Sequence, residues 1–501
     1  MSTTSTAPVR GAAAPEAPTR APRLPEAFWL GAVLVVVVVL GVFDAAGKSL
    51  WFDEAISVAV ARMPWHDFMH TVTADEANMS IYYLLLRPWI AIGGDGEAWI
   101  RLLSVVAAVG TVATLYALAR RLFSFQVAIV AALLTAVNGF FVQFSQEARS
   151  YMLVAMLVTI ATYAFVRGIE DGGARWWVLY GAAVTLSVYG HFFAVWFPLA
   201  HVMSMPFLAD RTSRRWKPLV VTLAASSILV LPALRVAYVR RGTQIFWHPP
   251  VTLGSINGVF AAMSGSGGAV LAFATAGLGA LAVFGALRLW RTEGRGRDLW
   301  HQAVALGTFA VPAFGILAIC IVQKIIQIRY FSIVVPALAL VVSLGIAQIR
   351  WRAVRVGAVA VMVLLASVGV VRWYDAQKED WRSPLALVHR DAGANDAVVL
   401  FDPYRIKLVD YYDHGLGSVE RTRLVYPRAD FQPFPLYRQQ EHMSTAQIRA
   451  MAARADTVWV LVSNADEPAE VSRFARTMAQ THRRVRTQHF SRVRVVEWQR
   501  R

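Results

Sequence analysis

Acidic residues stand beside apolar segments at three points of the sequence. Asp53 and Glu54 follow the first apolar segment, Asp75 and Glu76 lie further along the same polar stretch, and Glu147 follows the third apolar segment. A carboxylate can take a proton from an attacking hydroxyl group, and it can hold a divalent cation. These positions are therefore candidates for general base catalysis or for binding a metal ion.

Basic residues recur beside the same apolar segments. The candidates are Arg149, Arg240, Arg241, Lys324 and Arg329. Their charge can neutralise a phosphate group as it departs. Carboxylates and cations together suit the transfer of a sugar from a lipid phosphate to a hydroxyl acceptor.

Each candidate also has a simpler interpretation. An acidic pair can belong to an ordinary solvated loop, but Asp53 and Glu54 are bracketed by aromatic and apolar residues, which favours a site. Arg240 and Arg241 can mark the end of a helix at a membrane surface. A single histidine near a helix end, such as His191, is more often a structural hydrogen-bonding residue than a substrate ligand.

The composition is that of a membrane protein. The chain has 501 residues, of which 56% are hydrophobic and 16% charged, and its net charge is +17. Soluble chains carry about 25% charged residues. The basic excess fits cytoplasmic loops and a phosphate-bearing substrate better than nucleic acid. Cys320 is the sole cysteine, so the chain can form neither an internal disulfide nor a sulfur-based metal cluster.

Apolar stretches long enough to cross a bilayer occur about eleven times. They cover residues 28–46, 99–119, 125–143, 150–167, 176–193, 194–209, 217–238, 267–288, 301–322, 331–349 and 355–373. Residues 1–25, rich in Ala, Pro and Thr, are expected to form a disordered cytoplasmic tail. The sequence thus predicts a polytopic α-helical transmembrane domain over residues 26–373.

The orientation follows from the basic residues of the short loops. With the N-terminus in the cytoplasm, every loop expected inside is basic: Arg120 and Arg121; Arg167 and Arg175; Arg211, Arg214, Arg215 and Lys217; Arg288, Arg291, Arg295 and Arg297; Arg350, Arg352 and Arg355. The segment Ile81–Ile92 is short and contains Arg87 and Pro88, so we expect it to lie in the outer interface within a first external loop, 47–97. We therefore expect a bacterial inner-membrane protein whose acidic candidates face outward.

Several segments resemble those of one enzyme family. They are Trp51–Ala55, Ile81–Leu86, Arg101–Ser104, Ala119–Phe123 and Phe144–Tyr151. In order and spacing they are similar to bacterial GT-C glycosyltransferases of the protein-mannosyltransferase-like family 39 type, a group that includes aminoarabinose transferases for lipid A. The likeness is clear over about the first 200 residues and weaker up to about residue 373.

The resemblance implies an inverting transferase that uses a polyprenyl-phosphate sugar at the outer membrane face. Asp53 would be the base or a metal-linked carboxylate, with Glu54 beside it and Glu147 as the second acid. Arg149 and Tyr151 would position that acid or the lipid phosphate. A divalent cation, Mg or Mn, would be held by Asp53 and Glu147, with no organic cofactor.

One loop departs from the family pattern. Many relatives carry His-Pro-Pro before a pair of tyrosines, where this chain has Asn78-Met79-Ser80 before Ile81, Tyr82 and Tyr83. Glu76 would then take part of the role of that loop, and Tyr82 remains a candidate for binding the substrate.

The composition changes to that of a soluble domain near residue 374. The pattern predicts strands over residues 397–401, 457–462 and 492–498. It predicts amphipathic helices over residues 444–455 and 467–480. We expect a small extracytoplasmic α/β domain over residues 374–501. It contains no Gly-rich phosphate loop, so a role in guiding an acceptor or partner is favoured over nucleotide binding.

Two alternatives stay open at this point. A transporter or flippase for a lipid-linked substrate would also use basic residues in a membrane cavity, but it should show an internal repeat or paired broken helices. A non-catalytic assembly protein for lipid-linked glycans is favoured by the absent His-Pro-Pro.

Overall fold

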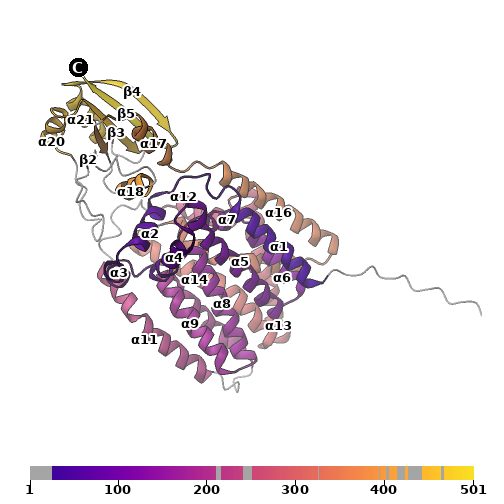
Figure 1. Cartoon of the computed structure of the whole chain (residues 1–501). Coiled ribbons are helices and arrows are strands. Elements are labelled where there is room, and N and C mark those ends of the chain that lie inside the picture. The colour runs from indigo at the N-terminus through magenta and orange to yellow at the C-terminus, as the bar shows by residue number, and fades with distance from the viewer. Residues whose placement is uncertain are drawn as a thin grey trace, which may run out of the picture.

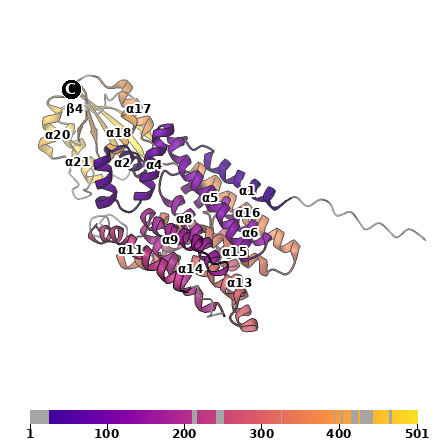
Figure 2. The ribbon, with the colours of Figure 1, turned by 60° about the horizontal axis from the view of Figure 1, so that its bottom comes forward.

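A computed structural model describes residues 25–209, 216–240, 251–324, 326–393, 395–401, 405–414, 424–426, 443–463 and 468–501. The chain forms a bundle of long helices with a small sheet domain at one end of it (Figure 1). Seen after a 60° turn, the sheet domain still projects from that end alone (Figure 2). We call this the domain end of the bundle.

Every one of the eleven predicted spans contains a helix. The bundle helices are α1 (Glu26–Val42), α5 (Glu97–Leu122), α6 (Phe125–Ala136), α7 (Gly139–Ser145), α8 (Tyr151–Glu170), α9 (Ala174–Gly190), α10 (Trp196–Ser204), α11 (Trp216–Arg240), α13 (Ala269–Glu293), α14 (Arg297–Gln323), α15 (Val335–Gln348) and α16 (Arg352–Asp375). Among the described residues, seven helices are long and apolar enough to cross a membrane, or eight if one bent pair counts as a single span.

The outer surface of the bundle suits lipid. Large apolar side chains are exposed on α11, α13 and α16, among them Val221, Phe273, Phe284 and Leu364. Apolar patches of this extent are unfavourable in water and favourable against acyl chains. The protein is therefore a multi-pass membrane protein.

The third predicted span is not one continuous helix. α6 and α7 meet at an angle of 63°. α6 ends at Ala136, and Asn138 then caps the start of α7, because its Oδ1 accepts hydrogen bonds from the backbone N–H groups of Phe140 and Phe141, each at 3.0 Å. Gly139 lets α7 approach α16 closely, since a Cβ there would lie 2.5 Å from the backbone of Gly369. The bend redirects the chain into the loop that carries Glu147.

The loop expected to be external, 47–97, forms three short helices and a π-helical turn; we call it the 47–97 loop. These are α2 (Phe52–Arg62), α3 (Trp65–His70), η1 (Thr71–Asp75) and α4 (Ser80–Gly93). Arg87 lies on the otherwise apolar α4, and its guanidinium donates to the carbonyls of Ala61 (3.0 Å) and Met63 (2.6 Å). These bonds give the guanidinium hydrogen-bond acceptors and fix α4 against the end of α2.

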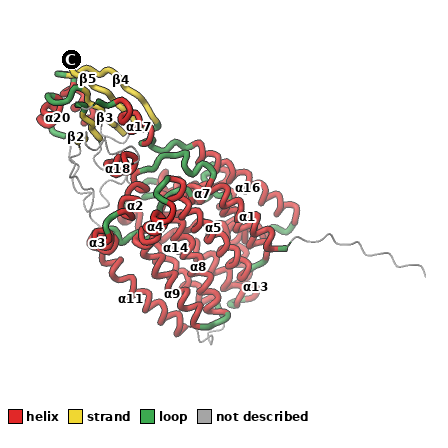
Figure 3. The backbone as a smooth tube through the Cα atoms, viewed as in Figure 1, coloured by secondary structure: helices red, strands yellow, loops and turns green. Residues whose placement is uncertain are grey.

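The sheet domain contains five strands in the order β2-β1-β3-β5-β4. Their bounds are β1 (Ala397–Leu400), β2 (Leu424–Tyr426), β3 (Thr457–Ser463), β4 (His482–Phe490) and β5 (Val493–Arg500). β1 pairs parallel with β2 and β3, whereas β5 pairs antiparallel with β3 and β4. Helices cover the sheet: α17 (Arg382–Asp391), α18 (Ile406–His414), α20 (Thr445–Ala452) and α21 (Pro468–Met478). Figure 3 shows this change from helix to strand at the domain end.

The sheet domain is joined to the bundle by a shared core. Trp381, Leu400 and Leu461 from the domain belong to the same buried cluster as Leu50 and Ala55 from the start of the 47–97 loop. α18 packs against α2. The domain therefore sits directly on the loop that begins with the acidic pair.

The opposite end of the bundle gathers the basic loops. Glu26 at the start of α1 pairs with Arg120 at the end of α5 (3.0 Å). Glu170 at the end of α8 pairs with Arg121 (2.5 Å) and with Arg297 (2.6 Å) at the start of α14. Three of the loops predicted to be cytoplasmic, those after α5, after α8 and before α14, thus lie together at the end of the bundle away from the sheet domain (Figure 1).

Candidate active site

Asp53 lies in the first turn of α2 and points its carboxylate at two arginines. Its Oδ2 is 3.3 Å from Nη1 of Arg329 and 3.8 Å from Nη2 of Arg149. Arg149 also donates to the backbone carbonyl of Asp53 at 3.2 Å and to Ser57 Oγ at 3.4 Å. The Asp53 side chain keeps 18% of its surface exposed. A carboxylate and two guanidinium groups thus meet at a partly open position.

Glu54, the next residue, is fully buried and its oxygens are occupied. Arg101 donates through Nε to Oε1 at 2.8 Å and through Nη2 to Oε2 at 2.7 Å. The backbone N–H of Ala148 also donates to Oε1, at 2.9 Å. Burial raises the pKa of Glu54, but Arg101 and Lys378 outweigh it and hold the pKa at about 2. Glu54 is thus an anion that ties the 47–97 loop, α5 and the Glu147 loop together.

Glu147 is buried and faces a lysine from a distant part of the chain. Its Oε1 lies 3.2 Å from Nζ of Lys378, which follows α16. Gln143 donates to the same oxygen at 3.5 Å, while Oε2 has no hydrogen-bond partner among the described residues. Burial raises the pKa of Glu147, and Lys378 opposes that rise.

Glu76 and Tyr82 both lie within the electrostatic influence of Arg149. Burial raises the pKa of Glu76 to about 7, against the opposing charge of Arg149. Tyr82 is buried, and its hydroxyl lies 3.5 Å from Ser104 Oγ. Ser104 in turn donates to the backbone carbonyl of Glu147 at 2.6 Å. Tyr82 therefore lies behind the Glu147 loop, where it packs against the residue that holds that loop.

Aromatic residues close the site beside Arg329. The ring centroids of Tyr151 and Tyr330 lie 6.0 and 5.3 Å from that of His191. His191 Nδ1 accepts a hydrogen bond from the backbone N–H of Phe193 at 3.3 Å. The imidazole packs as one ring of this aromatic group.

Three further phosphate ligands were predicted, Lys324, Arg240 and Arg241. Lys324 ends α14 with an exposed side chain in a left-handed backbone conformation, at a φ of 55°. Arg240 is the last residue of α11, and Arg241 lies outside the described residues.

The donor set fits a divalent cation poorly. No group of three or more His, Cys, Asp or Glu side chains suited to a metal occurs among the described residues. Asp53 is held by Arg149 and Arg329, and Glu147 by Lys378. These cations already supply the positive charge that an ion between Asp53 and Glu147 would bring.

Two residues of the cluster were not among the sequence candidates. Arg101 lies at the start of the second span, and its pairing with Glu54 depends on the folded loop. Lys378 follows the last span on the expected outer side, where the positive-inside rule disfavours a lysine. That misplacement is the signal that could have drawn attention to it.

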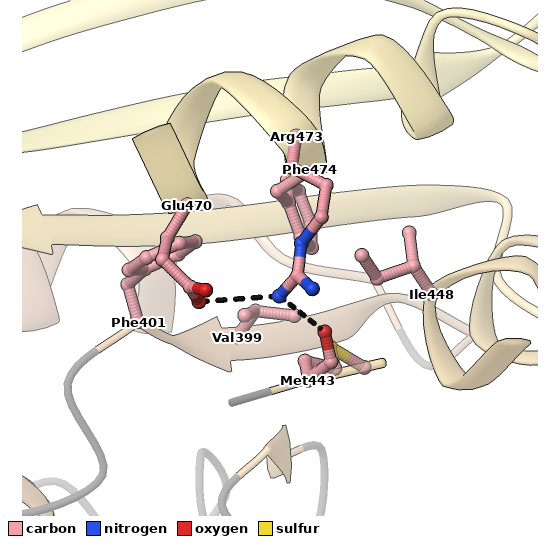
Figure 4. A pocket seen from close by; sticks show the side chains of 7 residues that line it. All are labelled: Val399, Phe401, Met443, Ile448, Glu470, Arg473 and Phe474. Atoms are coloured by element: carbon pink, nitrogen blue, oxygen red, sulfur yellow. Dashed lines mark hydrogen bonds and ion pairs between the residues drawn. The ribbon is translucent and has the colours of Figure 1, made fainter. Parts of the chain in front are cut away.

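The sheet domain contains a small pocket of a different character (Figure 4). Val399, Phe401, Met443, Ile448 and Phe474 line it, with Glu470 and Arg473 at its edge. Arg473 donates to the Met443 carbonyl at 3.0 Å and pairs with Glu470 at 3.2 Å. The contact with Met443 ties α21 to the segment just before α20.

Comparisons with known proteins agree with this architecture. Residues 79–235 match the family model described as dolichyl-phosphate-mannose-protein mannosyltransferase. The structure of ArnT from Cupriavidus metallidurans in the apo state is similar over 94% of this chain and 98% of that one, with a TM-score of 0.62 and 12% sequence identity. The chain has the GT-C fold. The structural similarity extends over the sheet domain, because the alignment spans nearly the whole of both chains.

Two other solved structures share the GT-C fold. ArnT from the same organism bound to undecaprenyl phosphate aligns over 94% of this chain and 98% of that one, with a TM-score of 0.61 and 12% identity. The oligosaccharyltransferase of Archaeoglobus fulgidus tethered to an acceptor peptide aligns over 90% of this chain and 70% of that one, with a TM-score of 0.54 and 12% identity. No curated protein matches the chain by sequence.

Proposed function

We propose that the protein is a membrane glycosyltransferase that moves a sugar from a polyprenyl phosphate to a hydroxyl-bearing acceptor of the cell envelope. The observation that carries this proposal is the placement of Asp53 Oδ2 3.3 Å from Arg329 and 3.8 Å from Arg149, with part of its surface open. The site thus offers a proton acceptor and two anion-binding groups side by side. The match to a mannosyltransferase family model and the solved complex of ArnT with undecaprenyl phosphate support the same substrate class.

The reaction assigns a role to each group. The acceptor oxygen attacks the anomeric carbon while the bond from that carbon to the phosphate oxygen breaks, which inverts the configuration. Asp53 accepts the acceptor proton. Arg149 and Arg329 neutralise the charge that develops on the departing lipid phosphate. Glu147 lines the same site as the second acid, and Glu54 holds α2 in place through Arg101.

We place this site at the extracytoplasmic face of a bacterial inner membrane. The basic loops lie at the opposite end of the bundle, where Arg120, Arg121 and Arg297 form ion pairs. An excess of Lys and Arg in short loops favours the cytoplasmic side. The N-terminus would then be cytoplasmic and the sheet domain outside.

The proposed chemistry needs no step through a metal ion. Arg149, Arg329 and Lys378 surround the carboxylates that were expected to hold Mg or Mn. We therefore expect turnover in vesicles to persist in the presence of EDTA. Loss of turnover that Mg or Mn alone restores would contradict this assignment.

The decisive experiment measures sugar transfer in vesicles loaded with a polyprenyl-phosphate sugar and a total extract of envelope acceptors. Asp53→Asn should abolish transfer while the melting temperature stays that of the parent, because the amide keeps the shape of the side chain but cannot take the proton. Arg352→Ala, an exposed substitution at the far end of α16, is the matched control. Undiminished transfer by Asp53→Asn would refute the assignment, and movement of the intact lipid-linked sugar without transfer would favour a flippase.

A further inference from the structure

The segment between α16 and the sheet domain enters the candidate active site. Lys378, three residues beyond the end of α16, places its Nζ 3.2 Å from Glu147 Oε1 and 3.7 Å from Glu54 Oε2. Only 14% of its side chain is exposed. The ammonium also lies over two indole rings, 5.9 Å from the centroid of Trp51 and 5.1 Å from that of Trp373.

The indole of Trp51 links the Asp53–Arg329 pair to the Glu147–Lys378 pair. Arg329, which pairs with Asp53, lies 5.4 Å from the centroid of the ring that Lys378 also contacts. Lys378 therefore belongs to the same cluster as the proposed base. It lies outside residues 79–235, so the family match says nothing about it.

Glu147 depends on this lysine for its charge partner. Glu54 already receives two hydrogen bonds from Arg101, and among the described residues the ammonium of Lys378 is the cation that pairs with Glu147. A buried carboxylate without a partner cation is strongly disfavoured. Removing Lys378 would therefore let the Glu147 side chain reorient or take up a proton.

The neighbouring residues clamp Lys378 between the bundle and the sheet domain. Ser49, just before α2, donates to the Glu379 carbonyl at 3.2 Å and accepts from the Trp381 backbone N–H at 3.1 Å. On the domain side, the Asp380 N–H donates to the carbonyl of Ser491, in the turn between β4 and β5, at 2.9 Å.

The Glu379 side chain gathers three further groups of the domain. It accepts hydrogen bonds from Trp381 Nε1 at 3.0 Å and from Ser463 Oγ on β3 at 3.1 Å, and it pairs with Arg405 at 3.1 Å. Arg405 lies 5.7 Å from the ring of Phe52, the residue before Asp53. The seating of the sheet domain thus fixes both Lys378 and the start of α2.

We propose that Lys378 is a positioning residue of the active site, which holds the Glu147 carboxylate in its working place and makes the sheet domain part of the catalytic unit. This proposal rests on the proposed glycosyltransferase function and assigns the sheet domain a role within it. Lys378 acts through Glu147 and is not itself a ligand of the reacting atoms.

The test is a double-mutant cycle on kcat in vesicles, with the full chain and a polyprenyl-phosphate sugar as donor. Lys378→Met should lower kcat about 100-fold, the loss that misplacement of a catalytic group can cause, with little change in the donor KM. Lys378→Arg should recover most of kcat because it restores the cation. In Lys378→Met/Glu147→Gln the two losses should not add, since both remove the same ordered carboxylate.

A control variant and a variant of Glu379, which joins the Lys378 segment to the sheet domain, complete the design. Lys217→Met, at an exposed lysine on α11, should leave kcat unchanged. Glu379→Ala should lower kcat and couple to Lys378→Met, because it loosens the segment from the domain. Additive losses in the Glu147 cycle, or a raised donor KM with unchanged kcat, would overturn the proposal. If Asp53→Asn is active, the proposed function itself fails; if Asp53→Asn is inactive and the cycle is additive, only this inference fails.

Discussion

Asp53 and Glu54 are adjacent in the chain and have opposite surroundings. The Asp53 carboxylate is partly open and lies 3.3 Å from Arg329 across the site. The Glu54 carboxylate is fully buried and receives both hydrogen bonds of a bidentate contact from Arg101. One turn of α2 thus supplies a proposed catalytic carboxylate and, beside it, the ion pair that fixes that turn.

The Glu54–Arg101 pair should control folding more than chemistry. Arg101→Met leaves a buried carboxylate without its partner, and breaking a buried pair in this way costs about 3–5 kcal/mol. We expect a clearly lower melting temperature in detergent, measured by tryptophan fluorescence. The double variant Glu54→Gln/Arg101→Met removes both charges and should regain part of the loss. A melting temperature equal to that of the parent in Arg101→Met would contradict a structural role for the pair.

Glu76 should make stability depend on pH. Its carboxyl has a pKa of about 7 in the folded protein, and about 4.3 is usual for an unfolded chain. The folded state therefore binds more protons between these values, and the free energy of unfolding falls as the pH rises through that window. Glu76→Gln stays uncharged throughout and should lessen this fall. The measurement compares melting temperatures of both proteins at pH 5 and pH 8; parallel changes would show that Glu76 does not titrate as proposed.

Arg329 should matter for the donor phosphate. Arg329→Ala removes one of the two guanidinium groups beside Asp53, and loss of one group that stabilises developing charge lowers the rate about 100-fold or more. Arg329→Lys should recover only part of kcat/KM, because an ammonium lacks the two-pronged geometry of guanidinium. Transfer assays with varied donor measure this effect, with Arg352→Ala as control. An unchanged kcat/KM in Arg329→Ala would remove Arg329 from the phosphate site.

Much of the bundle could be predicted from the sequence because long apolar runs have few alternatives. Each of the eleven runs contains a helix. The bend between α6 and α7 escaped notice because hydropathy averages over a window, while the bend depends on one side chain, Asn138, and on the contact of Gly139 with Gly369. β4 escaped notice because it is an edge strand with exposed arginines such as Arg483 and Arg484, so it lacks an apolar face to detect.

The sequence predicted the candidate site only in part, for a related reason. Asp53, Glu147 and Arg149 stand next to span ends, so their gathering at one end of the bundle follows from topology. The direction of each side chain does not follow from topology. Whether Glu54 faces the site or Arg101, and whether Lys378 reaches Glu147, depends on how the sheet domain packs on the 47–97 loop.

The bend at Asn138 offers a test of how the helices support the site. Asn138 caps α7 through Oδ1, and its Nδ2 donates to the Met263 carbonyl at 3.0 Å in a buried setting. Asn138→Ala removes the cap and leaves that carbonyl unpaired, which should cost about 1–3 kcal/mol of stability. Because α7 carries Gln143, which donates to Glu147, kcat should fall as well.

A matched variant separates the two functions of Asn138. Asn138→Ser keeps an oxygen that can cap α7 but loses the donor to Met263, so its melting temperature and kcat should lie between those of the parent and of Asn138→Ala. Melting in detergent and transfer in vesicles give the two readouts. Equal behaviour of the serine and alanine variants would mean that the contact with Met263, and not the cap, holds the bend and the Glu147 loop that follows it.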